Sequence, residues 1–372
     1  MKFLKNIFLV TIPTLFVFAI FLEVVARFIL PTSDFPDVSF HPVYGNQFVP
    51  DQSGTFIRGE NQQIKGKFRI NKQGWNSPYD YEPQKPPGTY RIAAIGDSYV
   101  EALQVDYDQS FTYLLEDNLR KKIPTKKFQA YSFGHTGANL TQNLAVFKNV
   151  SKVYKPDLAI IVLIHNDFLE SFEGFGRVDN FTLRKQGETF EVVSPRPAST
   201  MDMKRLFRKS ALVRYLVLNH RVLERFSFIR SWYYGDTRKV DANVSLEKAK
   251  AYSSEEFLEM LEYSFGQFKN LADQSNTKLL FVMNTARFPA EVTKYGAVSS
   301  MSRFNEFSRQ TAEKLGLEFL DLTPVFQESW DSSGEWHKWK MDSHWNHKGH
   351  QVVAEALSAK LEDLLKLSAK KK

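Results

Sequence analysis

Ser98, Asp342 and His344 are the residues of this sequence whose types and surroundings best fit a chemical reaction. A serine hydroxyl is a poor nucleophile near neutral pH, so a reactive serine needs a base within hydrogen-bonding distance. A histidine can take that proton and later return it to a leaving group. One residue separates Asp342 from His344, which allows the carboxylate to orient the imidazole of its near neighbour, as in a hydrolytic triad. The tripeptide Gly96-Asp97-Ser98 is uninformative alone, since such residues before a helix are most often only caps.

A metal site is the main alternative for the region around His344. Three histidines and an aspartate occur within nine residues, at Asp342, His344, His347 and His350. The last two histidines are expected at the start of a helix, and the sequence has no second cluster of carboxylates and histidines to complete a coordination sphere. The chain also has no cysteine, which excludes disulfides, thiolate catalysis and cysteine-ligated metals. We therefore expect neither a metal nor a cofactor.

The elements that must position these residues begin with a short apolar run, Ile92–Ile95, which is typical of a buried strand in a parallel sheet. Two further apolar runs, 128–133 and 158–164, also end in clusters of glycine, asparagine, aspartate or histidine. The carboxyl ends of parallel strands meet at one edge of a sheet, where ligands bind in open α/β folds. Ser98 is therefore expected at such an edge, where a strand turns into a helix. Val100 excludes the Gly-x-Ser-x-Gly elbow of α/β-hydrolases.

Other periodic segments extend this alternation of strand and helix. The predicted elements are a helix with apolar positions from Phe111 to Leu119, a helix over 141–153, a hairpin over 178–193, helices over 254–272, 302–315 and 349–367, and strands over 278–283 and 317–322. Residues 203–234 are basic and aromatic with a helical pattern. For them an amphipathic cap helix is favoured over a contact with a membrane surface or a polysaccharide.

The first thirty residues predict a membrane anchor. Lys2 and Lys5 precede an uncharged apolar run from Ile7 to Leu22, and the segment is long enough to span a bilayer. The lysines predict that the N-terminus stays inside and that the rest of the chain is translocated. A signal peptide cleaved near Ala26 is the alternative.

The composition bounds the remaining function classes. The 372 residues have a formal net charge of +7, but lysines at the two ends supply much of it, so charge does not argue for nucleic acid. A hydrophobic content of 43% is enough for a large core. Residues 31–90 are rich in proline, glycine, asparagine and aromatic residues, and they are expected to form an ordered connector that packs on the main domain.

Four segments together resemble the SGNH hydrolases, also called GDSL esterases and lipases, over about 91–367. In chain order they are Gly96-Asp97-Ser98, Phe133-Gly134-His135-Thr136-Gly137, Asn166-Asp167 and Asp342-Ser343-His344-Trp345-Asn346. The sequence departs from the family pattern where Ile164-His165 replaces the glycine and small residue usual before Asn-Asp. It also has one residue between the acid and the histidine, where many members have two. That spacing is similar to the spacing in enzymes that remove or transfer acetyl groups on cell-envelope polysaccharides.

The resemblance implies a flavodoxin-like three-layer α/β/α fold with a central parallel sheet, in addition to the N-terminal transmembrane helix. It implies that Ser98 is the nucleophile, His344 the base and Asp342 the acid of a triad. It also implies an oxyanion hole made by the N–H of Ser98, the N–H of Gly137 and the side-chain amide of Asn166. Such donors stabilise the charge of a tetrahedral intermediate.

The expected organisation is a membrane anchor or signal peptide over 1–30, the connector over 31–90, a catalytic domain over 91–367 and a basic tail over 368–372. The catalytic domain carries an insert at about 168–250. His135 and His165 either contact substrate or fill the rim of the pocket, and the sequence leaves both roles open.

Three functions fit these residues. The first is a serine esterase that hydrolyses an O-acyl ester, with acetyl as the expected acyl group, of an envelope glycan or lipid. The second is an O-acyltransferase that modifies an exported polysaccharide with the same triad. The third is a non-catalytic glycan-binding or assembly protein, which the intact triad disfavours.

The expected location follows from the anchor. We expect a bacterial-type inner membrane protein with a single span and its catalytic domain in the periplasm or outside, or a secreted protein after cleavage near Ala26. The expected partners are an acylated carbohydrate or lipid substrate and the membrane itself, without nucleic acid.

Overall fold

The computed structural model describes residues 7–198, 205–206, 208–222, 254–286, 288–289, 291 and 302–370. At its centre lies a five-stranded parallel sheet with the order β11-β10-β7-β5-β6. Its strands are β5 (Thr89–Gly96), β6 (Lys127–Gly134), β7 (Leu158–Leu163), β10 (Lys278–Met283) and β11 (Glu318–Asp321). Counted from the β6 edge, the chain order is 2-1-3-4-5, which is the flavodoxin-like order of a doubly wound sheet. The predicted fold class is confirmed.

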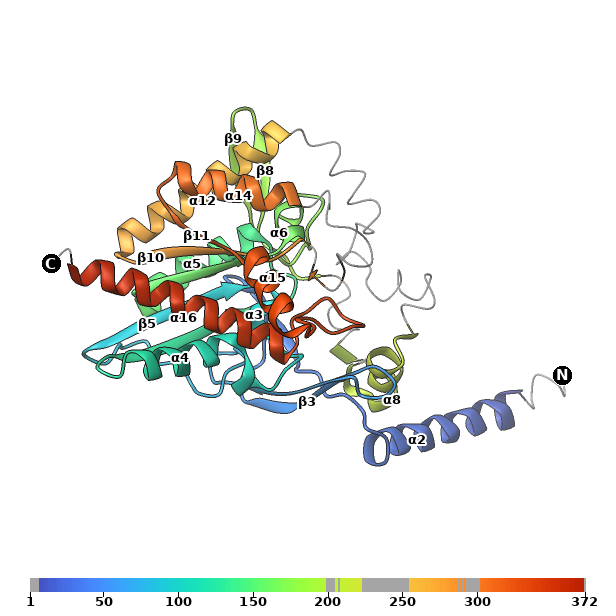
Figure 1. Cartoon of the computed structure of the whole chain (residues 1–372). Helices are drawn as coiled ribbons and strands as arrows, with labels where there is room; N and C mark the ends of the chain where they lie inside the picture. Colours follow the sequence, from blue (N-terminus) through green and yellow to red (C-terminus); the bar gives the residue numbers. More distant parts are fainter. Residues whose placement is uncertain are drawn as a thin grey trace.

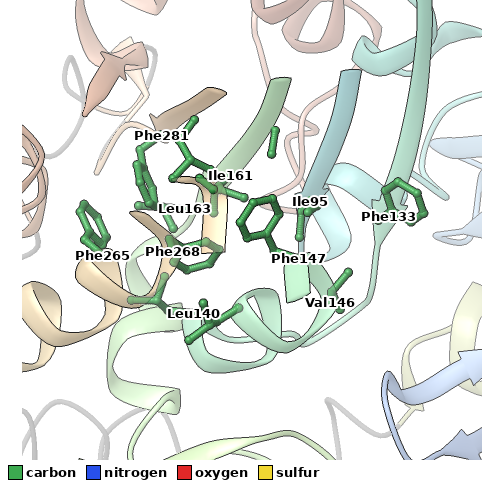
Figure 2. Packing of buried hydrophobic residues seen from close by; sticks show 14 of the residues in the cluster. Ile95, Phe133, Leu140, Val146, Phe147, Ile161, Leu163, Phe265, Phe268 and Phe281 are labelled. Carbon is green, nitrogen blue, oxygen red and sulfur yellow. The ribbon is translucent and has the colours of Figure 1, made fainter. Parts of the chain in front are cut away.

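Helices cover both faces of this sheet (Figure 1). One face packs against α5 (Leu140–Tyr154), α12 (Ser254–Ser275) and α14 (Ser302–Lys314), and the other against α4 (Phe111–Lys122), α15 (Leu322–Ser333) and α16 (His347–Lys370). Successive strand residues point to opposite faces, so Ile161 belongs to the first core and Val162 to the second. Figure 2 shows the first core, where Phe265 of α12 stacks on Phe281 of β10 with ring centroids 4.0 Å apart.

The predicted strands and most predicted helices match the structure to within a few residues. The helix at Ser98 is the main difference, because α3 (Ser98–Glu101) has a single turn and ends at Ala102 with φ of 56°. The apolar pattern that follows belongs to the separate helix α4. Helix α15 was not expected from the sequence, and α16 continues to Lys370, into the segment expected to be a basic tail.

The connector contains two antiparallel strand pairs that its composition does not predict. They are β1 (Val38–His41) with β2 (Gly45–Phe48), and β3 (Gln52–Arg58) with β4 (Ile64–Ile70). Phe56 of β3 and Phe68 of β4 pack with Leu103, which follows α3, in a separate apolar cluster. Gly66 of β4 comes so close to the backbone after α3 that a Cβ there would lie 2.5 Å from the carbonyl oxygen of Leu103. The hairpin β3–β4 is therefore fitted onto the segment that follows Ser98.

The N-terminal apolar segment forms η1 (Ile7–Thr11) and α2 (Ile12–Phe28), which projects from the rest of the protein in Figure 1. The helix over Leu9–Phe28 is long and apolar enough to cross a membrane, by length and composition. Its large apolar side chains are exposed.

The end of α2 is hydrogen-bonded to the insert at α8 (Ala211–Arg214). The carboxylate of Glu23 accepts from the hydroxyl of Ser210 at 2.7 Å and from the backbone N–H groups of Ala211 and Leu212 at 2.9 and 3.0 Å. Asn219 at the end of η3 (Tyr215–Asn219) donates to the carbonyl of Pro31 at 3.0 Å. These contacts, here called the anchor clamp, join α2 directly to the insert.

The described part of the insert also contains the expected hairpin, with β8 (Thr182–Gln186) paired to β9 (Thr189–Val193). The basic aromatic stretch predicted as a helix over 203–234 is described only at 205–206 and 208–222. The rest of that prediction lies outside the described residues.

Candidate active site

Ser98 stands at the carboxyl edge of the sheet, as the first residue of α3, directly after the turn that ends β5. The side chain of Asp97 caps α3 by accepting from the N–H of Tyr99 at 3.0 Å. The tight turn needs a small residue before it, because a Cβ on Gly96 would lie 2.5 Å from a methyl group of Val100. The serine hydroxyl is thereby presented, half-buried, at the edge where a parallel sheet binds ligands.

The structure brings Ser98, His344 and Asp342 together across more than 240 positions of sequence. The Ser98 hydroxyl lies 2.7 Å from Nε2 of His344, a distance suited to donating its proton to that nitrogen. On the other side of the ring, Nδ1–H donates to Oδ1 of Asp342. The same oxygen accepts from the backbone N–H of His344 at 3.0 Å. The three side chains therefore form one hydrogen-bonded chain.

The loop that carries the aspartate and the histidine is held by the buried aromatic residue that follows them. Trp345 is fully buried, its ring contacts Tyr99 at 4.9 Å between centroids, and its Nε1–H donates to Asn284 at 3.2 Å. The Tyr99 hydroxyl in turn donates to the carbonyl of Ser343 at 2.7 Å. The turn after Ser98 and the loop of His344 are thus packed on each other.

Asp342 also contacts a residue from the connector. Nη1 of Arg58, at the end of β3, donates to Oδ2 of Asp342 at 2.5 Å. Burial alone would raise the pKa of the Asp342 carboxyl, but the hydrogen bond and charge of His344 together with the charge of Arg58 hold that pKa well below its ordinary value. The carboxylate is therefore ionised over the whole physiological range.

Gly137 lies in the loop after β6, next to the serine turn. Its φ of 76° is a left-handed conformation that glycine adopts without strain. Its carbonyl accepts from the side chain of Asn180 at 2.5 Å. A Cβ at this position would lie 3.1 Å from Nη1 of Arg177, so a guanidinium stands beside the glycine. Asp179 holds that guanidinium with two hydrogen bonds of 2.8 Å.

Glu101, the last residue of α3, is hydrogen-bonded to the loop that carries Gly137. Its buried carboxylate accepts from the N–H of Thr136 at 2.7 Å and from the hydroxyl of Thr136 at 2.5 Å. The two segments meet closely, since a Cβ on Gly134 would lie 2.0 Å from the backbone nitrogen of Glu101. Burial raises the pKa of Glu101 to about 7, although the hydrogen bonds from Thr136 oppose that rise.

Asn166 is in the first turn of α6 (His165–Glu170) and is exposed. Its side-chain amide donates to Oε1 of Glu170 at 3.2 Å. The neighbouring Asp167 is buried and accepts from the N–H of Ile164 at 3.0 Å, and burial raises its pKa well above the ordinary value. Asp167 therefore fixes the start of α6, and Asn166 extends from it toward solvent.

The histidines near the site separate into different roles. His135 is buried, and burial lowers its pKa to about 4, so it is neutral at physiological pH. His165 is also buried and shares a hydrogen bond of 2.7 Å with Asn305. His350 accepts from the N–H of Phe111 at 3.2 Å.

His135 and His165, which the sequence placed either in contact with substrate or at the rim of the pocket, are therefore both mostly covered by protein. Within the described ranges, no group of three histidine, aspartate or glutamate side chains converges as metal ligands would. In particular, His344, His347 and His350 have different neighbours: the serine and aspartate of the site for the first, Trp339 for the second and Phe111 for the third.

Comparison with known families decides the class of this protein. A family model described as the GDSL-like lipase/acylhydrolase family matches residues 94–352, more than half of the chain. This chain belongs to the GDSL-like lipase/acylhydrolase family. As a member of that family it is a serine hydrolase that acts on ester bonds, and the resemblance found in the sequence is confirmed. A comparison with curated protein sequences found no match.

Solved structures similar to this GDSL-like hydrolase include three esterases or hydrolases at low sequence identity. LAE5, an α/β hydrolase enzyme from the metagenome of Lake Arreo in Spain, is 14% identical with a TM-score of 0.41, covering 73% of this chain and 94% of LAE5. A catalytic mutant of Axe2, an acetylxylan esterase from Geobacillus stearothermophilus, is 13% identical with a TM-score of 0.40, covering 72% and 92%. A two-domain esterase active on acetylated mannans is 13% identical with a TM-score of 0.40, covering 74% and 49%.

Three side chains at the site of this GDSL-like hydrolase were not found from the sequence: Arg58, Glu101 and Arg177. Arg58 precedes the matched family region and lies in a connector without periodicity, so no motif points to it. Arg177 lies in the insert, where no motif points to it either. Glu101 did carry a signal, because it stands one helical turn after the serine and is acidic within an otherwise apolar stretch.

Proposed function

We propose that this protein hydrolyses an O-acyl ester, such as an acetyl ester, of a glycan or lipid of the cell envelope, with Ser98 as nucleophile. The observation that carries the proposal is the hydrogen-bonded chain from Ser98 through His344 to Asp342. In this proposal the Ser98 oxygen attacks the acyl carbon while its proton moves to Nε2 of His344. Asp342 keeps the other ring nitrogen protonated and stabilises the imidazolium that forms.

The oxyanion of the tetrahedral intermediate would be bound by the N–H of Ser98, the N–H of Gly137 and the amide of Asn166. Gly137 supports this role because its conformation is fixed: its φ of 76° suits glycine, and the side chain of Asn180 donates to its carbonyl. The Asn166 amide now donates to Glu170, so we expect it to turn from that carboxylate to the oxyanion during the reaction. Removing one such donor typically costs about 100- to 1000-fold in rate.

Breakdown of the intermediate completes the first half of the reaction. His344 returns its proton to the leaving alcohol oxygen, and the acyl group remains on Ser98 as an ester. Water then attacks this ester with His344 again as base, which releases the carboxylic acid and restores the serine. In an O-acyltransferase a sugar hydroxyl would take the place of that water.

The proposed location supports the choice of substrate. If α2 spans the inner membrane with the preceding Lys2 and Lys5 on the cytoplasmic side, the catalytic domain faces the periplasm or the exterior. The ester would then belong to an envelope component or an exported molecule.

The test is turnover of a short-chain aryl ester by the purified full-length protein in detergent, with and without an added sugar acceptor. We expect hydrolysis by the wild type and less than a few per cent of it in Ser98→Ala, which should keep the same thermal midpoint because the side chain is half-buried at a loop edge. Residual activity above that level would overturn the assignment of Ser98. Faster release of the aryl alcohol with acceptor, accompanied by an acylated sugar, would instead identify a transferase.

A further inference from the structure

Arg58 lies where it can control the geometry of the proposed triad. Its Nη1 contacts Oδ2 of Asp342 at 2.5 Å, while Oδ1 of the same carboxylate faces His344. We propose that Arg58 is a positioning residue for ester hydrolysis, which fixes the Asp342 carboxylate so that one oxygen always faces the imidazole. The inference rests on the roles proposed above for Ser98, His344 and Asp342. Arg58 lies before residue 94, so the contact comes from a part of the chain that the family match does not cover.

The hairpin that carries Arg58 is fixed to the segment after the serine turn. Its strands bury Phe56 and Phe68 against Leu103. The backbone N–H of Lys67 donates to Asp106 at 2.8 Å, close to the point where Gly66 meets the backbone. Because apolar packing and backbone contacts both hold the hairpin, the Cα of Arg58 has a defined position relative to Ser98.

The loop that carries Asp342 rests on the same apolar cluster. Trp339 and Met341 are partly buried against it. The N–H of Asp342 donates to the carbonyl of Trp339 at 3.2 Å, and the N–H of Trp339 donates to the carbonyl of His344 at 3.2 Å. The hairpin that carries Arg58 and the loop that carries Asp342 thus pack on the same apolar cluster. Through this packing the connector contributes a side chain to the site.

The contact differs from an ordinary surface ion pair. The Asp342 side chain is only 3% exposed and that of Arg58 is 26% exposed, so solvent screens the pair little on the carboxylate side. A carboxylate held through one oxygen can rotate about its Cβ–Cγ bond, whereas one held through both oxygens cannot. A planar guanidinium suits this purpose because it binds carboxylates with defined geometry.

Loss of the guanidinium should therefore reduce catalysis without removing any reacting group. Small misplacements of a catalytic group cost up to about 100-fold in rate, so we expect kcat to fall by about 10- to 100-fold in Arg58→Met. KM should change less than 3-fold, roughly, because the proposed role acts on the base and not on bound substrate.

The pH dependence provides a second readout. Several charged or titratable groups face the Asp342–His344 pair, from β3, from the β5–α3 turn, from α3 and from α16. They are Arg58, Asp97, Tyr99, Glu101 and His350. Arg58 is the cation among these that contacts the carboxylate directly. Without its charge the pair takes up a proton at higher pH, so the acid limb of kcat/KM should move up by about 0.5–1 pH unit.

The experiment compares Arg58→Met and Arg58→Lys with Arg69→Met in the full-length protein. Arg69 is a matched control, because it lies on the same hairpin and pairs with Asp80 at 2.9 Å, away from the triad. We expect Arg69→Met to keep wild-type kcat and pH profile. Arg58→Lys should restore the acid limb, because it keeps the charge, but only part of kcat, because an ammonium lacks the planar fork.

A double-variant cycle with Asp342→Asn separates positioning from other roles. If Arg58 acts through the carboxylate, adding Arg58→Met to Asp342→Asn should cause no further loss of kcat. An additive 10- to 100-fold loss, or an Arg58→Met effect confined to KM, would overturn the inference. If Arg58→Met does not fold, an Arg58→Lys profile identical to the wild type in both kcat and pH would also overturn it. Activity that persists in Ser98→Ala would instead reject the proposed function itself.

Discussion

The raised pKa of Glu101 predicts a measurable cost of keeping this carboxylate under the Gly137 loop. Its pKa is raised from an ordinary 4.5 to about 7, chiefly by burial. The folded protein therefore binds the Glu101 proton more tightly than the unfolded chain does, and stability from this group falls as pH rises from 4.5 to about 7. At about 1.4 kcal/mol per pH unit, the fall amounts to about 3 kcal/mol.

Glu101→Gln should abolish this dependence while keeping the local structure. The amide oxygen can accept from the N–H of Thr136, and the amide NH2 group can donate to the Thr136 hydroxyl, which is able to accept. Two neighbouring buried carboxyls, Asp97 and Asp167, also have raised pKa values, but they are present in both proteins. The difference between the wild type and the variant therefore isolates Glu101, apart from its repulsion with Asp97.

The assay is the thermal midpoint of both proteins in the same detergent at pH 5, 6, 7 and 8. For a domain of this size about 1 kcal/mol corresponds to about 2 °C. Part of this fall has already occurred at pH 5, so the midpoint of Glu101→Gln should gain about 5 °C relative to the wild type between pH 5 and pH 8. Glu355→Gln, which removes an exposed carboxylate on α16, is the control and should follow the wild type. Parallel curves for the wild type and Glu101→Gln would refute the reasoning.

Three further predictions concern the site and its support. Asp342→Asn should lower kcat by about 10⁴-fold, because an amide NH2 group facing Nδ1 of His344 favours the wrong tautomer; a loss under 10-fold, roughly, would contradict this. Gly137→Ala should lower kcat by about 100-fold through strain at a φ of 76°, whereas Gly187→Ala, at a φ of 60° in the hairpin β8–β9 with open space around it, should leave kcat unchanged. Trp345→Ala should cost about 3–5 kcal/mol of stability, and a thermal midpoint equal to the wild type would contradict the packing described here.

The sheet and its polar edge were predictable because each strand carries its own signal. Runs such as Leu158–Leu163 are apolar on both faces, which is typical of a strand covered by helices on each side. The residues at their ends, among them Ser98 and Asn166, could then be assigned to one edge by topology alone. The contact between Ser98 and His344 was predicted only by combining this edge with the chemistry that a serine needs.

Contacts from the connector could not be predicted in the same way. Strands β3 and β4 have seven residues each, and β4 alternates buried and exposed positions, but this pattern does not indicate which surface the hairpin covers. Its packing against Leu103 depends on tertiary contacts and on the close approach at Gly66. The contact of Arg58 with Asp342 spans 284 positions and involves a residue type that is common on surfaces. The end of α3 at Ala102, in a left-handed conformation, likewise has no local cause such as glycine or proline.

The anchor clamp bears on how this protein can mature. Removal of residues 1–26 by a signal peptidase would take Glu23 away and leave the N–H groups of Ala211 and Leu212 without their acceptor. The same cut would separate the carbonyl of Ala26 from the hydroxyl of Thr32, which donates to it at 2.6 Å. A processed form would thus lose the contacts of Glu23 with Ser210 and α8, whereas the hydrogen bond from Asn219 to the carbonyl of Pro31 would remain. If the helix is retained, the Glu23 carboxylate continues to accept from the first N–H groups of α8.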